Sequence, residues 1–142
     1  MTPKAAVPYK LEDQIGHILR RASQRHTGIF SSLMPDNLTP TRFAALAKLL
    51  ECGSLSQNEL GRLTAMDIAT IKGVVDRLRQ RGLVVSNKDL NDARRQLISL
   101  TPAGLEAIQA AIPEAISVTE QTVSTLSAEE ASELVRLLQK IT

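Results

Sequence analysis

The chain has 142 residues, of which 43% are hydrophobic and 23% are charged. This length suits one domain with its own core, and the hydrophobic content excludes a disordered chain. Only three residues are aromatic. The core must therefore consist of Leu, Ile, Val and Ala side chains, which favours helices packed on one another.

No targeting or membrane signal is visible. No apolar run approaches the roughly 20 residues that a membrane-spanning helix needs, and the N-terminus lacks the apolar core of a signal peptide. A single cysteine cannot form an internal disulfide, which suits a reducing compartment. We therefore expect a cytoplasmic protein without a membrane partner.

The formal net charge of +2 is too small to indicate a nucleic-acid partner by itself, but its distribution is informative. Residues 67–95 contain seven basic and four acidic side chains, whereas residues 96–142 contain two basic and six acidic ones. A positive middle segment followed by a negative one predicts a local, orienting attraction to phosphates.

Two amphipathic helices are predicted in the first third of the chain. Residues 1–8, with two prolines, look like a loose arm. A first helix is expected to run to about Phe30, on the helical spacing of Leu11, Ile15, Ile18, Leu19 and Ala22. A second helix begins with Thr39 as its cap and Pro40 at its first position, and Gly53 ends it. Its buried stripe is predicted to be Phe43, Leu46, Ala47 and Leu50.

The middle of the chain predicts a helix-turn-helix followed by a hairpin. Ser56 and Glu59 form a capping box for a third helix. Asp67 caps a fourth, which ends at Gly82 and buries Ile71, Val74, Val75 and Leu78. Two strand-like runs follow, 83–86 and 96–100, joined by a polar turn. This order is typical of a winged helix-turn-helix, in which one helix enters the DNA major groove and the hairpin lies beside it.

Two further helices are predicted at the C-terminus. Thr101 and Pro102 start the fifth, which has a kink at Pro113 and the apolar residues Leu105, Ile108, Ile112 and Ile116. Ser127 and Glu130 form a capping box for the last, which carries Ala131, Leu134, Val135, Leu138 and Ile141 on one side. The predicted fold is mainly α, with six helices and a two-stranded wing.

We predict a single domain over residues 1–142 with two regions. Residues 36–101 form the DNA-binding lobe. Residues 1–35 and 102–142 carry more apolar stripe than a small winged helix covers, so we assign them to a helical dimerisation region.

The outward face of the fourth helix follows from its buried side. It comprises Ala69, Lys72, Gly73 and Asp76, with Thr70 at the edge. Thr70 and Lys72 are candidates for hydrogen bonds to base edges, and a methyl group of Ala69 or Thr70 for contact with thymine. A carboxylate repels phosphate, so Asp76 is expected to pair with a nearby arginine, such as Arg77 or one in the wing. The alternative is that this face is an ordinary solvated helix surface. The hairpin that follows the helix favours a DNA-binding face over this alternative.

The wing carries two neighbouring arginines, Arg94 and Arg95, whose side chains point to opposite faces of a strand. One is expected to be structural and the other to enter the minor groove, and the sequence leaves open which. Asp89 and Asp92 are interpreted as local turn caps that hold an arginine in place. The predicted DNA-binding residues are Ser56, Gln57, Ile68, Ala69, Thr70, Lys72, Gly73, Arg77, Arg94 and Arg95.

These motifs resemble those of the MarR family of bacterial regulators. The resemblance rests on Asp89-x-x-Asp92-x-Arg94 with Leu100-Thr101-x-x-Gly104, and on residues 60–84. It implies an obligate homodimer, a palindromic operator and a small phenolic or carboxylic ligand that releases the DNA. Ile68 departs from the polar residue usual at its position. Residues 39–63 resemble regulators of aromatic or pyridine-carboxylate breakdown, including the nicotinate branch.

The first helix also carries candidate residues for a ligand site. His17, Arg20 and Arg21 share a face of the first helix and are our candidates for holding a carboxylate effector, with Phe43 as an apolar wall where the first, second and fifth helices meet. The alternative to a ligand site is that these arginines are ordinary exposed residues of an amphipathic helix. A zinc site is not expected because His17 and His26 lack metal-ligand spacing, and Cys52 is interpreted as a packing residue.

No catalytic arrangement or cofactor motif is visible, so we do not expect an enzyme. The leading hypothesis is a homodimeric repressor that binds a palindromic operator in the major groove. A small aromatic or pyridine-carboxylate effector is expected to release it. The alternatives are a winged-helix protein-interaction module and a sequence-independent architectural DNA binder.

Overall fold

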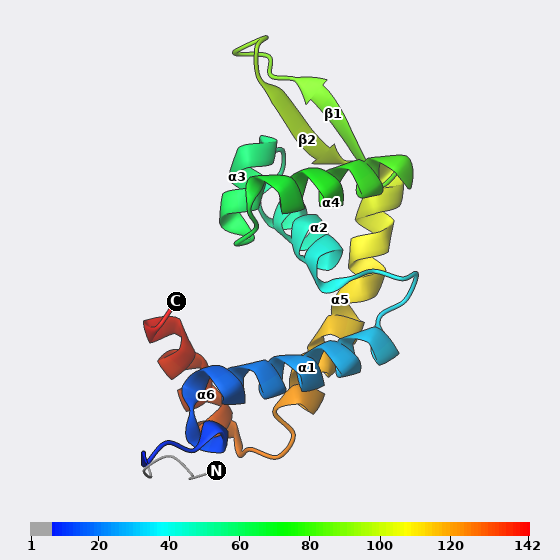
Figure 1. Cartoon of the computed structure of the whole chain (residues 1–142). Helices are drawn as coiled ribbons and strands as arrows, with labels where there is room; N and C mark the ends of the chain where they lie inside the picture. Colours follow the sequence, from blue (N-terminus) through cyan, green and yellow to red (C-terminus); the bar gives the residue numbers. More distant parts are fainter. Residues whose placement is uncertain (1–6) are drawn as a thin grey trace, which may run out of the picture.

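The computed structural model describes residues 7–142 of the chain (Figure 1). Within them lie a short 3-10 turn, six α-helices and one two-stranded sheet. The helices α2, α3 and α4 and the sheet form one lobe, and α1 and α6 lie at the opposite end of the molecule (Figure 1). The long helix α5 runs from one end to the other. The predicted mainly α fold with a wing is therefore confirmed.

Helix α1 (Ile15–Leu33) begins later and ends later than the sequence predicts. The 3-10 turn η1 (Leu11–Asp13) precedes it, and the extended backbone of Gln14 separates the two. The helix ends before Pro35, whose ring disfavours a helical conformation at the preceding residue. Most of the predicted N-terminal arm lies outside the described residues.

Helix α2 (Pro40–Cys52) begins and ends as predicted. The Thr39 side chain accepts a hydrogen bond from the backbone N–H of Arg42, and Gly53 follows the helix with a φ of 79°. The buried side differs from the prediction, because Ala45, Leu46 and Leu49 are buried whereas Leu50 is exposed. Helix α2 is enclosed by α3, α4, α5 and β2, and these neighbours set its buried side.

The two helices of the helix-turn-helix carry the predicted caps. In α3 (Gln57–Leu63), the Ser56 hydroxyl accepts from the backbone N–H of Glu59, and the Glu59 carboxylate accepts from the backbone N–H of Ser56. In α4 (Ile68–Gln80), Asp67 accepts from the backbone N–H of Thr70 at 2.7 Å. The predicted stripe of α4 is buried, namely Ile71, Val74, Val75 and Leu78.

The wing consists of β1 (Val84–Lys88) and β2 (Gln96–Leu100), which pair antiparallel from Val84 with Leu100 to Lys88 with Gln96. Strand β1 begins one residue later than predicted. Leu83 joins the end of α4 to the wing, because its backbone N–H donates to the carbonyl of Leu78 and its carbonyl accepts from the N–H of Thr101, next to the pair of Val84 and Leu100. Leu55 pairs with Ile98 and ties the loop before α3 to β2.

Helix α5 (Pro102–Thr122) is locked to the end of α4 by a close approach at Gly104. The Thr101 hydroxyl donates to the carbonyl of Gly82 at 2.6 Å and accepts from the backbone N–H of Gly104. A side-chain carbon added at Gly104 would overlap the carbonyl oxygen of Leu83. Glycine is therefore required at this position. The helix is continuous across Pro113.

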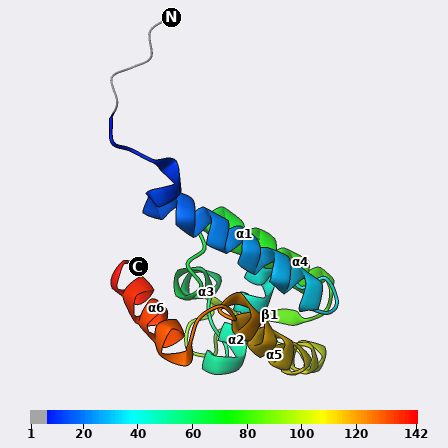
Figure 2. The ribbon, with the colours of Figure 1, turned by 90° about the horizontal axis from the view of Figure 1, so that it is seen from below.

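Helix α6 (Ala128–Lys140) begins with the predicted capping box of Ser127 and Glu130 and has no buried residue. Figure 2 shows it apart from α1, beyond the end of α5. Several large apolar side chains of α1, α5 and α6 are exposed, including Ile15 (64%), Ile116 (55%) and Val135 (52%). A single copy of the chain therefore leaves these helices partly uncovered. No helix within residues 7–142 is both long and apolar enough to cross a bilayer.

Candidate nucleic-acid interface

The outward face of α4 is open to solvent, as the predicted helix orientation requires. Ala69, Thr70, Lys72 and Gly73 are all exposed, opposite the buried side of the helix. No atom outside its own helix lies within 4 Å of a side-chain carbon added at Gly73. A flat surface such as the edge of a base pair therefore has access to the backbone of α4 at this point.

Asp76 pairs with a nearby arginine, as expected, but this arginine is Arg79 and not Arg77 or one in the wing. Its carboxylate accepts from Lys72 at 2.8 Å and from Arg79 at 3.0 Å. These partners lie four residues before and three after it, the spacings at which side chains meet on a helix. The hydrogen bond from Lys72 is the first reason why the pKa of Asp76 lies below its usual value. Arg79 also donates to Ser86, which joins α4 to β1.

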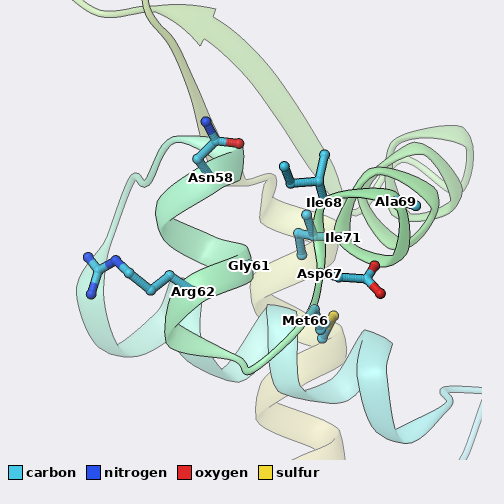
Figure 3. Close-up of a pocket in the computed structure, with 8 residues that line it drawn as sticks. All are labelled: Asn58, Gly61, Arg62, Met66, Asp67, Ile68, Ala69 and Ile71. Carbon is cyan, nitrogen blue, oxygen red and sulfur yellow. The ribbon is translucent and has the colours of Figure 1, made fainter.

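An open hollow of about 610 Å³ lies between α3 and the first turn of α4. Figure 3 shows Ile71 between the two helices and Ile68 at the open side, on the same side as Asn58. Arg62 points outward from α3 in the same view. Ile68 is 76% exposed, so it contributes little to the core. Gly61 permits the close packing of the helices, since a side-chain carbon there would lie 3.0 Å from Ile71.

The structure distinguishes the two wing arginines. Arg95 pairs with the carboxylate of Glu59 in α3. The side chain of Arg94 is 92% exposed, and among residues 7–142 its only hydrogen-bond partner is Asp92, at 3.2 Å. Asp92 also accepts from the backbone N–H of Arg94, and Asp89 accepts from that of Asn91. The predicted turn-capping roles of both aspartates are therefore confirmed, and Arg94 is the arginine that projects from the wing.

The remaining candidates lie at the edges of this surface. Ser56 and Gln57, at the start of α3, are half-buried, and both the hydroxyl and the backbone N–H of Ser56 are engaged in the capping box. Arg77 is exposed and lines a groove of about 350 Å³ between α4 and the N-terminus of α2. Thr41 and Arg42 line the same groove. The sequence reasoning missed these two residues, because only the fold brings α2 beside α4.

A smaller pocket, of about 260 Å³, lies where α1, α2 and α5 meet. Phe43 lines it, as expected, together with His26, Phe30, Pro40, Ala115, Val118 and Thr119. The rings of Phe30 and Phe43 pack edge to face with centroids 6.0 Å apart. The Nδ1 atom of His26 lies 3.0 Å from the hydroxyl of Thr122 in α5. Aromatic walls and one imidazole make the pocket suitable for a small planar molecule.

His17, Arg20 and Arg21 do not line this pocket, although the sequence reasoning placed them there. His26 supplies the imidazole instead, nine residues after His17, a distance of about 13 Å along the helix. Arg20 and Arg21 are exposed. The Nδ1 atom of His17 is buried and has no hydrogen-bond partner within the described residues.

Cys52 is exposed at the end of α2, so the predicted packing role is also wrong. The buried side of α2 passes through Leu49, three residues earlier, and leaves Cys52 outside it.

Comparison with known proteins agrees with this geometry. The model of the MarR family matches residues 38–95. The HTH-type transcriptional repressor NicR of Pseudomonas putida is 40% identical over 145 aligned positions, which cover 99% of this chain and 92% of the relative. The crystal structure of a probable transcriptional regulator from Pseudomonas aeruginosa is 47% identical and has a TM-score of 0.92, covering 94% of this chain and 100% of the other.

A further similar structure is that of Bordetella bronchiseptica BpsR, whose DNA binding is regulated by 6-hydroxynicotinic acid. It is 38% identical with a TM-score of 0.91, covering 95% of this chain and 97% of the other. These similarities extend over nearly the whole sequence. The chain therefore belongs to the MarR family and is a DNA-binding transcriptional regulator.

Proposed function

We propose that this regulator is a homodimeric repressor that binds a palindromic operator and is released by a pyridine carboxylate or a related aromatic acid. The observation that carries the proposal is the uncovered outward face of α4, together with the exposed Arg94 in the wing of the same lobe. Helix α4 enters the major groove and the wing reaches the minor groove. Thr70 and Lys72 contact bases or nearby phosphates, and Arg42 and Arg77 flank them.

The dimer is proposed from the exposed apolar side chains of α1, α5 and α6. Burial of apolar surface is the main favourable term in protein association, and a helix with no buried residue, such as α6, gains most from a second copy. This assigns residues 1–35 and 102–142 to the dimerisation region and 36–101 to the DNA-binding lobe. Twofold symmetry then requires the two α4 helices to lie about 34–36 Å apart, one turn of DNA.

The effector site is proposed to be the pocket where α1, α2 and α5 meet, because it lies between the DNA-binding lobe and the dimerisation helices. Phe43 provides an aromatic wall. Since the Nδ1 atom of His26 is engaged with Thr122, the Nε2 atom is the one that meets the ligand. His17, Arg20 and Arg21 remain candidates for holding the carboxylate, from a second copy of the chain.

The class of effector is proposed from two relatives. The first is named NicR, and the DNA binding of the second, BpsR, is regulated by 6-hydroxynicotinic acid. A single-ring acid also suits the volume of the pocket, about 260 Å³. An effector acts only through a difference in affinity between the DNA-competent and the misaligned dimer, so operator DNA must weaken effector binding by the same factor.

The test uses fluorescence anisotropy with a duplex from the region upstream of the protein's own gene, with unrelated DNA as competitor. We expect tight binding that weakens with salt, because bound counterions are released. The duplex is then titrated in the presence of 6-hydroxynicotinate, nicotinate or benzoate. A protein-interaction module would show no salt-dependent shift, and an architectural binder would be displaced equally by any DNA.

Calorimetry locates the effector. The ligand that weakens operator binding is titrated into the wild type and into the His26→Ala, His17→Ala and Arg20→Ala variants. We expect His26→Ala to lose affinity. Loss at His17 or Arg20 would indicate a contribution from a second copy. Equal binding by all the variants would place the site elsewhere.

A further inference from the structure

The first turn of α4 presents methyl groups to the solvent. Ile68 is the first residue of the helix and is 76% exposed, and Ala69 beside it is also exposed. The core contact of this turn is made by Ile71, which is 1% exposed. Figure 3 shows the Ile68 side chain at the open side of the hollow between α3 and α4. Packing within the chain therefore does not explain a large apolar residue at position 68.

Two of the hydrogen-bond donors near this turn already have partners. The backbone N–H of Thr70 donates to Asp67, and the ammonium of Lys72 donates to Asp76. Asp76 is also held by Arg79. A hydrogen bond from Lys72 to a base must therefore compete with an ion pair in its own helix. At the start of α4, the exposed side chains of Ile68 and Ala69 offer apolar contacts that need no rearrangement.

We propose that Ile68 reads the 5-methyl group of a thymine in the major groove, and that the operator carries a thymine at this position in each half-site. The proposal rests on the proposed docking of α4 in that groove. Among the four bases, only thymine presents a methyl group there. The basic residues Arg42, Arg77 and Arg94 of the same lobe favour DNA as the occupant over an uncharged protein surface.

The experiment removes the methyl group from the DNA. High-affinity duplexes are selected from a random library with the wild-type dimer, and each thymine is replaced singly by deoxyuridine. Burying a methyl group contributes about 0.8 kcal/mol, so its removal at the contacted position should weaken binding about fourfold. Replacement in both half-sites should weaken binding about fifteenfold, because independent contacts add.

Protein variants connect this effect to one side chain. In Ile68→Ala the ratio between the thymine and deoxyuridine affinities should fall towards one at that position. Ile68→Val should keep most of the ratio. The matched control is Leu63→Ala, which shortens another exposed apolar side chain of the helix-turn-helix (40% exposed) and should leave the ratio unchanged.

The outcomes separate this proposal from the one on which it rests. If no duplex is selected over random DNA, the proposed sequence-specific docking fails. If duplexes are selected but replacing each thymine by deoxyuridine leaves the affinity unchanged, the proposed thymine contact is wrong. It is also wrong if Ile68→Ala shows the same loss of affinity as the wild type at every thymine. If Ile68→Ala changes the oligomeric state but not the affinity ratio, Ile68 serves a protein contact instead.

Discussion

Arg95 of the wing pairs with Glu59 of α3, 36 residues earlier in the chain. The same carboxylate accepts from Ser56 and closes the capping box of α3. One side chain therefore connects the start of the helix-turn-helix to the turn end of the wing, where Arg95 precedes β2. The pKa of Glu59 lies below its usual value. The main cause is the hydrogen bonding from Ser56, and the positive charge of Arg95 contributes further.

This contact should be sensitive to acid. Because the pKa of Glu59 is lower in the folded than in the unfolded chain, its stabilising effect is complete above the ordinary glutamate pKa of about 4.3 and is lost as the pH falls through the lower, folded value. We expect Glu59→Gln to lower the unfolding temperature at pH 7, and we expect this difference from the wild type to shrink as the pH falls towards 3. Thermal melts across this range measure the difference.

The control for the acid experiment is Glu106→Gln. Glu106 is exposed and belongs to none of the ion pairs of the described residues, so its replacement should have little effect at either pH. If Glu59→Gln lowers the unfolding temperature by the same amount at pH 7 and at pH 3, the charge of the carboxylate is not the cause of the stabilisation.

The two wing arginines should differ in their roles. Arg94→Ala removes an exposed side chain, so we expect unchanged thermal stability, weaker DNA binding, and a plot of log affinity against log salt that is flatter by about one unit. Arg95→Ala breaks the pair with Glu59 and should lower thermal stability with an unchanged salt slope. Binding measured at several salt concentrations distinguishes them. The reverse pattern would assign the DNA contact to Arg95.

Gly73 provides a test of how closely DNA approaches α4. There is room for a methyl group at this position in the free protein, and alanine favours a helix over glycine by about 0.5–1 kcal/mol. Gly73→Ala should therefore stabilise the protein and yet weaken operator binding. Gly28→Ala is the matched control, because the same change in α1 meets open space outside the DNA-binding lobe. Unchanged affinity in Gly73→Ala would mean that DNA does not reach the backbone there.

Alanine is expected to destabilise the protein at Gly104, in contrast to Gly73. An added methyl group at Gly104 would overlap the backbone of Leu83. We expect Gly104→Ala to destabilise the protein by about 1–3 kcal/mol, the usual range for overpacking. Urea unfolding of Gly28→Ala, Gly73→Ala and Gly104→Ala in parallel separates this steric effect from helix propensity. A Gly104→Ala protein as stable as the wild type would contradict the tight junction of α4 with α5.

Removal of residues 127–142 should abolish the dimer. Helix α6 has exposed apolar residues and no buried residue. We therefore expect the truncated chain to remain folded as a monomer. A monomer holds one half-site, and operator binding should be lost with the dimer. Sedimentation, circular dichroism and anisotropy test the three points. A truncated protein that stays dimeric and binds DNA tightly would refute the proposed arrangement.

The local features of this protein follow from its sequence. The caps at Thr39, Ser56, Asp67 and Ser127 all lie where the sequence predicts them, because each is a hydrogen bond between residues three positions apart. The buried side of α4 was also predicted correctly, since an amphipathic helix on the protein surface shows its core side as a period of about 3.6 residues. These features depend on short stretches of chain.

Contacts between distant segments could not be predicted in the same way. The pair of Arg95 with Glu59, the groove shared by Arg42 and Arg77, and His26 in the pocket of Phe43 all depend on how separate elements pack. The shifted buried side of α2 has the same origin, because neighbours on several sides select which residues are covered. The spacing of residues along one helix determines which side chains share a face, but only packing decides what that face meets.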